Sequence, residues 1–599
     1  PIMPQARSRS TLGESGLLAI GFLALSGAVF AAHSTPATGY ELSLYTNTPL
    51  VFWVLSGCAL FVSLLVSFGA TTDWYRQLGL GLGGGSLVAF VGLPILRGYR
   101  FYGAGDALTH LGWMRSIQAG VFSPTELKYP ALHTVTSLLA TTLGIELTQA
   151  ATLVIVLLSC LFFIFVALST SAVFENRYST TVGAFSAFLL LPITNLSTFI
   201  IPHAMSQAIL FSSLFLYLVL RYVGRSRSHQ SPSAIGSLFV ITSVALLFYH
   251  PQLAAHLLVV CVGICLLQFL SRRYWETHPI AEHRPIYGQT IVLMGAFLAW
   301  TSVHDFFRGA VEYAVSSAIT YFVDDTTAGA STKSQSASLN DLGASVLELF
   351  MKLFGSSLVF VGLAGVLVLW MIWESDGTVT RKTHGILPYF VVGLIGLTGL
   401  FALYFLGSYS MMYFRVFGLM MLFVTVLGSV AITYGISSFS EHVSSEALHS
   451  AVAVGLGALL LLSALAVFPS PYLYSASPHV TEMSMEGHET AFENRDQDVT
   501  FVGIRAGPNR YADATSGELE RMRHYNGITG EEIDEGISQQ YSNDRYLTVT
   551  EADWQREVYA YQELRYSRSQ LASVSSQTGV NRIQSNGEFT LYYVRGAPE

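Results

Sequence analysis

Apolar residues fall into thirteen separate windows, each long enough to cross a hydrocarbon layer of ~30 Å as a helix. The windows are 16–33, 50–70, 77–96, 147–172, 179–197, 206–222, 235–250, 253–271, 289–305, 355–373, 385–405, 414–434 and 451–468. The pattern therefore predicts a polytopic α-helical membrane protein with about thirteen transmembrane helices, followed by a small α/β domain outside the membrane.

The composition supports this prediction. Of 599 residues, 51% are hydrophobic and 12% are charged, and the mean hydropathy is +0.48, so most of the chain must contact lipid. The first window lacks a small-residue cleavage site, which favours a retained helix over a signal peptide. All four cysteines lie in apolar segments, so we expect no structural disulfide; they are Cys58, Cys160, Cys261 and Cys265.

Positive residues then predict the orientation, because Lys and Arg gather in cytoplasmic loops. The pattern predicts a cytoplasmic N-terminus, because that orientation places most of the basic loops in the cytoplasm. These loops carry Arg7, Arg9, Arg76, Arg177, Arg221, Arg225, Arg227, Arg272, Arg273, Arg284, Arg381 and Lys382. The segment 434–450 is the exception, with two glutamates and no basic residue. An odd number of crossings places the C-terminal domain outside the cell, in a multi-pass protein of the cell membrane.

Two domains follow from this layout. Residues 1–468 form the membrane domain, with long outer loops at 97–146 and 306–354, and residues 469–599 form the outer domain. Within the outer domain we predict a strand at 499–505, a helix at 551–577 and a hairpin at 582–595 that turns at Asn586-Gly587.

The outer domain is strongly acidic. It holds 20 Asp and Glu residues against 11 Arg and no Lys, a net charge of −9. Such a surface repels itself at low ionic strength and is screened at high salt. This indicates a halophilic, archaeal source, with chance compositional bias as the alternative.

The first outer loop has the most informative motif. Asp106 and His110 are four residues apart, so on a short helix a carboxylate and an imidazole would share one face. Gly105 and Gly120 bracket this helix, and Tyr129-Pro130 follows it. A carboxylate at a helix N-terminus is also favourable as a simple cap, which is the structural alternative for Asp106.

The loop from Gly105 to Gly144 resembles the first outer loop of glycosyltransferases of the GT-C superfamily. These are polytopic enzymes that take a sugar from a polyprenyl-phosphate carrier. The resemblance implies that Asp106 is the catalytic base, and that its helix and the helix after Tyr129-Pro130 lie along the membrane surface. The layout of the whole chain is similar to that of the protein mannosyltransferase and aminoarabinose-transferase branches.

The sequence departs from the family pattern in several places. Where the family commonly has two adjacent carboxylates, this chain has Gly105-Asp106, and where it usually has a second proline, this chain has Ala131. Two additional helices also precede the loop. A Trp-Trp-Asp-Tyr-Gly-type motif is absent from the outer domain, so we do not expect oligosaccharide transfer to asparagine.

Other polar residues lie at the outer ends of predicted helices, where a lipid-linked sugar would present its phosphate. Ionisable groups at this depth line a cavity or anchor the helix at the interface. The candidates for lining the site are Tyr129, His203, Gln207, His250, Gln252, His304 and Asp305.

Phosphate binding is expected from arginine, because its planar fork holds a phosphate with two hydrogen bonds. Arg415 follows Tyr409 and Tyr413 at an outer boundary and resembles the late-helix arginine of GT-C enzymes. Arg97 and Arg100 precede the first outer loop. The alternative for each arginine is contact with lipid headgroups.

Cofactors are less defined. Asp324-Asp325 is similar to acidic metal motifs but lies in a Ser/Thr-rich segment that favours a solvated pair or a lid. A divalent metal therefore stays open, and no other cofactor is expected. The sequence has no phosphate-binding loop, dinucleotide fingerprint or basic patch, which argues against nucleotide-linked donors and nucleic acids.

The sequence thus predicts a glycosyltransferase that moves a sugar from a polyprenyl (dolichyl) phosphate to an acceptor hydroxyl on a glycan, lipid or protein at the outer face of the membrane. Asp106 would be the base, His110 would orient Asp106 or the acceptor, and Arg415 with Arg97 or Arg100 would neutralise the departing phosphate. Two alternatives are a transporter or flippase of lipid-linked sugars and a non-enzymatic envelope assembly protein.

Overall fold

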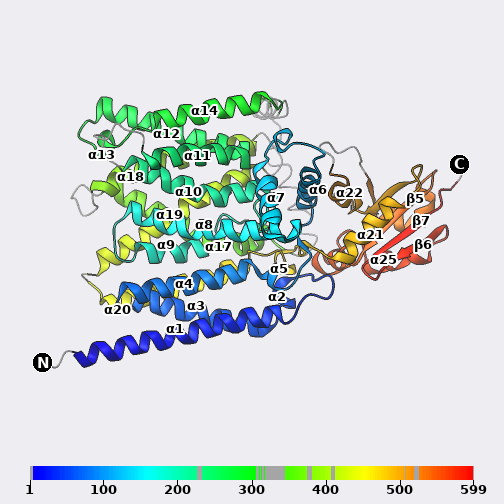
Figure 1. The fold of residues 1–599 in the computed structure, drawn as a ribbon, viewed down its shortest axis with the longest axis horizontal. Helices are drawn as coiled ribbons and strands as arrows, with labels where there is room; N and C mark the ends of the chain where they lie inside the picture. The colour runs from blue at the N-terminus through cyan, green and yellow to red at the C-terminus, as the bar shows by residue number, and fades with distance from the viewer. Residues whose placement is uncertain are drawn as a thin grey trace.

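A computed structural model describes residues 4–224, 233–304, 309, 312, 316, 344–373, 381–406, 412–440, 442–505, 507–517 and 525–597. Within them, each of the thirteen apolar windows contains one principal helix, and the window 77–96 also contains the short α5 Leu93–Leu96. Their bounds are α1 Pro4–His33, α3 Leu50–Gly69, α4 Asp73–Val91, α8 Leu147–Val173, α9 Ser179–Phe188, α10 Ala204–Val223, α11 Ala234–Tyr249, α12 Pro251–Tyr274, α14 Tyr287–Ser302, α17 Val346–Trp373, α18 Arg381–Leu406, α19 Met412–Phe439 and α20 Ser445–Ala464. The helices run roughly parallel to one another in a single bundle (Figure 1).

Nine of the described helices are long and apolar enough to cross a membrane, and the chain is a multi-pass membrane protein. The remaining four are α4, α9, α11 and α14. The fifth window departs from the prediction, because α9 ends at Phe188 and the chain up to His203 is irregular. Pro192 and the left-handed backbone of Leu190 (φ 49°) explain why the helix stops early.

The bundle has two ends of different character. At one end, Arg177 donates to the carbonyl of Ala70 (3.2 Å), Asn176 to Ser437 (2.8 Å), and Arg381 pairs with Glu282 (2.6 Å). These contacts join the short loops that carry the predicted basic residues. The C-terminal domain, which we continue to call the outer domain after its predicted side, and the first long loop lie at the opposite end (Figure 1).

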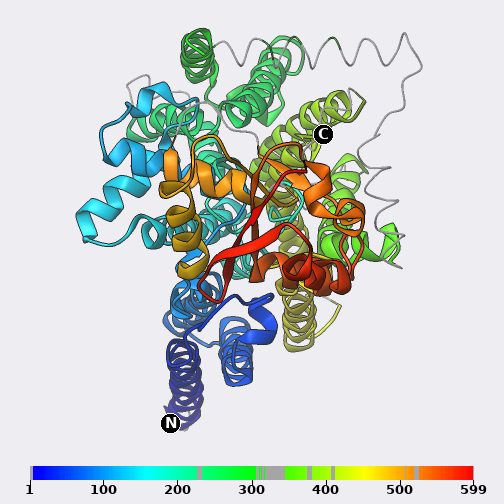
Figure 2. The same ribbon diagram turned by 90° about the vertical axis from the view of Figure 1, so that its right-hand side faces the viewer.

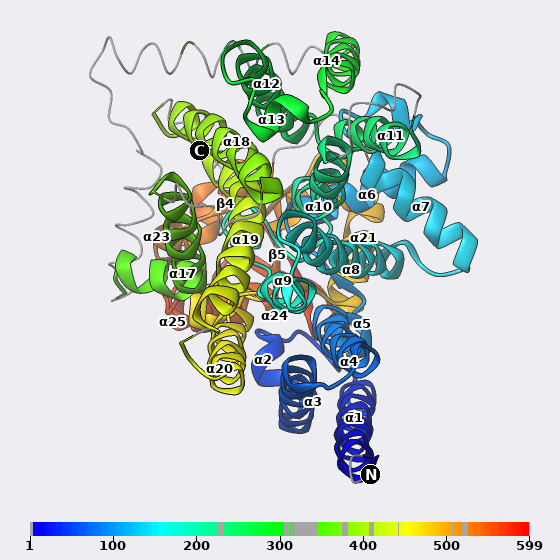
Figure 3. The same cartoon turned by 90° about the vertical axis from the view of Figure 1, so that its left-hand side faces the viewer.

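Seen from the basic end, the two additional helices α1 and α3 lie at one edge of the bundle, and α12 and α14 lie at the other (Figure 3). The largest cluster of buried apolar residues runs through the middle of the bundle, and a separate cluster fills the outer domain.

The first long loop forms β1 Phe101–Tyr102, α6 Asp106–Gln118, η1 Pro124–Glu126 and α7 Ala131–Leu143. The two predicted short helices are therefore present. Strand β1 pairs in antiparallel fashion with β2 His479–Val480, just after the last membrane helix. This pairing fastens the loop to the start of the outer domain, which covers the end of the bundle (Figure 2).

The outer domain contains a five-stranded sheet in the order β4-β3-β5-β7-β6. Strands β3, β4 and β5 are parallel, and β7 runs antiparallel to β5 and β6. The bounds are β3 Thr500–Ile504, β4 Asn526–Ile528, β5 Arg545–Thr550, β6 Val580–Ser585 and β7 Phe589–Val594. The helices are η2 Pro471–Leu473, α21 Glu482–Glu493, α22 Gly507–Ser516, α23 Gly530–Glu535, η3 Ile537–Gln540, α24 Glu551–Gln555, η4 Arg556–Ala560, α25 Arg568–Ser573 and η5 Val574–Ser576.

Two of the three predictions for this domain are confirmed. The strand at 499–505 is β3, and the hairpin turns at Asn586-Gly587, where Gly587 has a φ of 105° and Asn586 accepts from the backbone of Phe589. The prediction of a continuous helix at 551–577 is wrong. Left-handed backbone at Gln562 (φ 48°) and Glu563 (φ 62°) divides it into short pieces.

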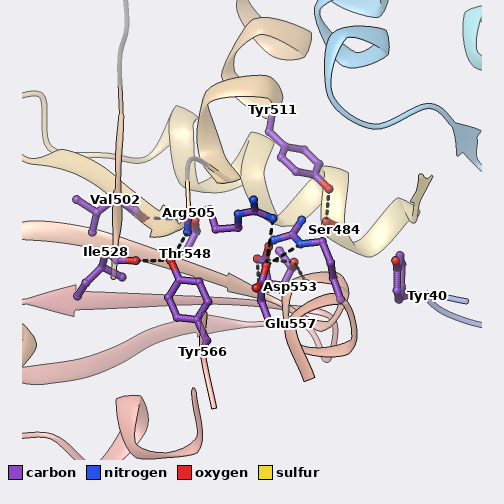
Figure 4. Close-up of polar contacts among 12 residues, drawn as sticks. Tyr40, Ser484, Val502, Arg505, Tyr511, Ile528, Thr548, Asp553, Glu557 and Tyr566 are labelled. Atoms are coloured by element: carbon purple, nitrogen blue, oxygen red, sulfur yellow. Dashed lines mark hydrogen bonds and ion pairs between the residues drawn. The ribbon is translucent and has the colours of Figure 1, made fainter. Parts of the chain in front are cut away.

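A buried ion cluster stabilises the carboxyl ends of β3 and β5 (Figure 4). Glu557 is fully buried and accepts from Arg556 (3.0 Å), and Arg505 lies 3.5 Å from the same carboxylate. Arg556 also pairs with Asp553 (2.6 Å). These contacts join the end of β3 to the helical segment that follows β5.

We expect Glu557→Ala to lower the free energy of unfolding of the outer domain by roughly 3 kcal/mol, because two arginines would lose a buried partner. Hydrogen exchange of the β3 and β5 amides in the full chain measures this change. The control is Arg568→Ala, which removes a surface arginine over Tyr559 and should stay within ~0.5 kcal/mol. Equal exchange rates in wild type and Glu557→Ala would contradict the assigned role.

Candidate functional site

Asp106 is the first residue of α6, and it does not cap that helix. The N-cap is Gly105, which has a φ of 62° and makes no side-chain cap hydrogen bond. The side chain of Asp106 is 54% exposed, so the carboxylate is accessible from outside the protein. Gly120, also left-handed (φ 71°), follows the end of α6, so the predicted glycine brackets are present.

An arginine of the outer domain binds this carboxylate. Arg510 of α22 forms an ion pair with Asp106 and donates a second hydrogen bond to Thr109 (2.8 Å). Sequence reasoning missed Arg510, because it lies about four hundred positions further along the chain. Its only sequence signal is a place on a short helix directly after a strand.

His110 is buried and pairs with a second histidine. Its Nδ1 lies 3.1 Å from Nε2 of His133, and the ring of Tyr129 stacks on His250 beside this pair (5.3 Å, 11°). Burial lowers the pKa of His110 to about 4; the charge of Asp106 opposes this shift and that of Arg510 adds to it. His110 is therefore neutral at pH 7, and its observed partner is His133, which was not predicted.

Arg415 faces buried amides that have spare hydrogen-bonding capacity. Its guanidinium donates to Oε1 of Gln252 (3.1 Å). Within the described part of the chain, no partner meets Nε2 of Gln252, Nδ1 of His250, or either polar atom of the Gln207 amide. Buried polar atoms are almost always satisfied by protein, water or ligand, so this group marks a place where a polar ligand fits.

His203 is a further buried histidine of this region. It is the N-cap of α10, and its Nδ1 lies 2.8 Å from Oγ of Ser206. Burial lowers its pKa to about 3, the positive charge of Arg415 adds to this shift, and the negative charge of Asp106 opposes it. Direct contacts lead from α6 towards Arg415: the ring of His110 lies 5.9 Å from that of Tyr129, Tyr129 stacks on His250 (5.3 Å), and Gln252, two residues further on, accepts from Arg415.

Arg97 and Arg100 are engaged elsewhere. Arg97 is buried in an ion pair with Glu41, and Arg100 pairs with Glu146. Neither is among the charges that shift the pKa of His110 or His203. Arg100 lies on a separate cavity of about 230 Å³ whose lining includes Tyr99, Arg100, Glu146, Gln149, Thr152 and Glu482.

Tyr413 is buried and packs its ring against the edges of Phe401 (5.7 Å) and Phe405 (5.4 Å). Such packing places the start of α19, and thereby Arg415. Tyr409 lies outside the described residues.

His304 lies just beyond α14, and its ring contacts Trp300 (4.8 Å). Trp300 in turn donates to the backbone carbonyl of Lys128 (2.9 Å), next to Tyr129. Burial lowers the pKa of His304, and the charge of Lys128 adds to this shift. Asp305 and Asp324-Asp325 lie outside the described residues, within which no group of three or more His, Cys, Asp or Glu is arranged for a metal ion.

A second, apolar cavity of about 360 Å³ lies between α17, α20 and the irregular segment after α9. Lys352 and Tyr472 line it together with many aliphatic side chains.

No protein-family model and no curated protein matches the chain. Among solved structures, ArnT from Cupriavidus metallidurans bound to undecaprenyl phosphate is similar, with 12% identity and a TM-score of 0.47 over 88% of this chain and 100% of that chain. The oligosaccharyltransferase of Archaeoglobus fulgidus, tethered with an acceptor peptide, has 11% identity and a TM-score of 0.47 over 88% of this chain and 75% of that chain. AglB from Archaeoglobus fulgidus in complex with an inhibitory peptide and a dolichol-phosphate has 12% identity and a TM-score of 0.41 over 92% of this chain and 75% of that chain.

These structure neighbours are GT-C glycosyltransferases. At such identities, and with TM-scores below 0.5, the activity of this chain has to be inferred from its own residues.

Proposed function

We propose that this protein is a GT-C-type glycosyltransferase that moves a sugar from a polyprenyl-phosphate carrier to an acceptor hydroxyl. The proposal is carried by an exposed carboxylate, Asp106, on the helix whose His110 contacts Tyr129, and by a guanidinium, Arg415, bound to a buried amide with an unmet donor two residues from His250, on which Tyr129 stacks. A base and a phosphate binder are the two groups that such a transfer needs.

In the proposed reaction, Asp106 takes the proton of the acceptor hydroxyl while its oxygen attacks the anomeric carbon of the sugar. The bond between that carbon and the phosphate oxygen breaks, and its electron pair stays on the lipid phosphate. Arg415 binds this phosphate and stabilises the charge as it develops. Neutral His110, hydrogen-bonded to His133, orients α6 and the acceptor rather than transferring the proton.

The donor's lipid chain needs an apolar path, and the cavity beside α17 and α20 has suitable aliphatic walls. The sugar and the acceptor class, whether glycan, lipid or protein, are left open. The acidic outer domain suits high salt, so a halophilic archaeal source stays part of the proposal.

We also propose that the N-terminus is cytoplasmic and the outer domain extracellular, because basic residues gather at the end of the bundle away from that domain. A membrane-impermeant thiol reagent should label Thr125→Cys in intact cells and label Thr277→Cys only after permeabilisation. Both positions are exposed, so access depends on the side of the membrane. The reverse labelling pattern would invert the orientation.

The direct cellular test is mass spectrometry of surface glycans and lipid-linked sugars in a deletion strain. A transferase predicts loss of one sugar from the glycan and accumulation of its lipid-linked donor. An assembly protein predicts no accumulated donor, and unchanged glycans together with an unchanged donor pool would contradict the proposal.

A further inference from the structure

Helix α22 of the outer domain lies directly on α6 of the first outer loop (Figures 1 and 2). At the crossing, a Cβ on Gly112 would lie 2.0 Å from the carbonyl oxygen of Asp513, so a larger residue cannot stand there without moving the helices apart. Ser116 also donates to the carbonyl of Gly517 (3.2 Å). The outer domain is thus seated on the helix that begins with Asp106.

Arg510 occupies the end of this interface nearest to Asp106. One nitrogen of its guanidinium pairs with the Asp106 carboxylate, and the other donates to the hydroxyl of Thr109 (2.8 Å). Thr109 donates in turn to Asp513 (2.6 Å), which lies one turn from Arg510 on α22. The guanidinium is therefore held in place by groups of both helices before it meets Asp106.

A second ion pair stabilises the same interface, and none of its contacts among the described residues is with Asp106. Arg115 pairs with Glu489 of α21 (2.7 Å) and donates to the carbonyl of Ala514 (3.2 Å). It lies more than two turns along α6 from Asp106. Both arginines therefore join the domain to α6, and of the two only Arg510 is shown to contact the carboxylate of Asp106.

We propose that Arg510 is a positioning residue of the transfer reaction, acting through Asp106. This inference rests on the proposed function of Asp106. A carboxylate at the first position of a helix turns freely about its side-chain bonds, whereas reaction requires its oxygen to face the acceptor hydroxyl within a narrow range. Arg510 pairs with Oδ1 of Asp106 and thereby fixes the direction in which the carboxylate faces, which makes the outer domain part of the site.

The test compares three variants of the full chain, each purified in detergent. The donor substrate in every assay is the lipid-linked sugar that accumulates in a deletion strain. Arg510→Ala should lower kcat ~10- to 100-fold with an unchanged KM for the donor, because orientation of the base is lost while donor binding is kept. Arg510→Lys should recover part of kcat, since an ammonium keeps the charge but not the two-armed geometry. Arg115→Ala is the matched control and should keep the wild-type kcat.

Three results would overturn the inference: a wild-type or raised kcat in Arg510→Ala, an equal loss in Arg510→Ala and Arg115→Ala, or a loss in Arg510→Ala that appears in KM alone. An equal loss would mean that Arg510 serves docking, and a raised kcat would mean that it restrains the base. Failure of the proposed function is recognised separately, since the wild-type protein would then transfer no sugar. Failure of the role of Asp106 would appear as normal transfer by Asp106→Asn, whatever Arg510 does.

Discussion

Replacing Asp106 by Asn should lower the rate of sugar transfer by at least ~10²-fold, because the amide keeps the shape of the carboxylate but cannot accept the acceptor's proton. Expression, thermal stability and donor binding should stay near wild type. Gly105 is the N-cap, so the cap is unchanged, and loss of a negative charge in the first turn costs at most ~1 kcal/mol. The lost pair with Arg510 is partly exposed and contributes a similar small amount.

Sugar transfer and thermal stability have to be measured on the same preparations. Only the two measurements together distinguish a catalytic role of Asp106 from a structural one. Normal transfer by Asp106→Asn would contradict the mechanism. Joint loss of activity and thermal stability would instead make Asp106 a structural residue.

The second large effect is expected at Arg415. Arg415→Ala should lower kcat by ~10² or more, as removal of one preorganised donor at a developing charge does in other enzymes. Arg415→Lys should also be strongly impaired although the charge is kept, because an ammonium cannot reproduce the planar fork that holds a phosphate with two hydrogen bonds.

Arg381→Ala provides a matched control at the other end of the bundle. Arg381 pairs with Glu282, and both side chains are about two thirds exposed, so its loss should change stability by less than ~1 kcal/mol and leave kcat at the wild-type value. Full activity in both Arg415 variants would show that Arg415 only anchors its helix to lipid headgroups.

The helical bundle could be predicted because few backbone structures are stable in the hydrocarbon layer of a membrane. Every backbone group in hydrocarbon needs an internal partner, so an apolar window of sufficient length becomes a helix. The prediction failed in detail where other forces act: α9 ends early before Pro192, and the helix after Thr550 is divided by left-handed residues at Gln562 and Glu563.

The candidate site could be predicted in part for a similar reason. Asp106 and His110 lie in one short motif, and Arg415 lies at a recognisable helix boundary. The partners of these residues are tertiary: no local pattern relates Asp106 to Arg510, or His110 to His133 rather than to Asp106. The burial of Arg97 against Glu41 could likewise not be predicted from the local sequence.

The central claim is that the protein breaks the bond between sugar and lipid phosphate. We would reconstitute the purified protein in liposomes with the accumulated lipid-linked sugar and an acceptor from the deletion strain, and follow free polyprenyl phosphate and acceptor-bound sugar by mass spectrometry. The two products should appear in equal amounts with wild type and fall at least ~10²-fold with Asp106→Asn. A lipid-linked sugar that stays intact, or that only moves from one leaflet to the other, would contradict a transferase and identify a carrier instead.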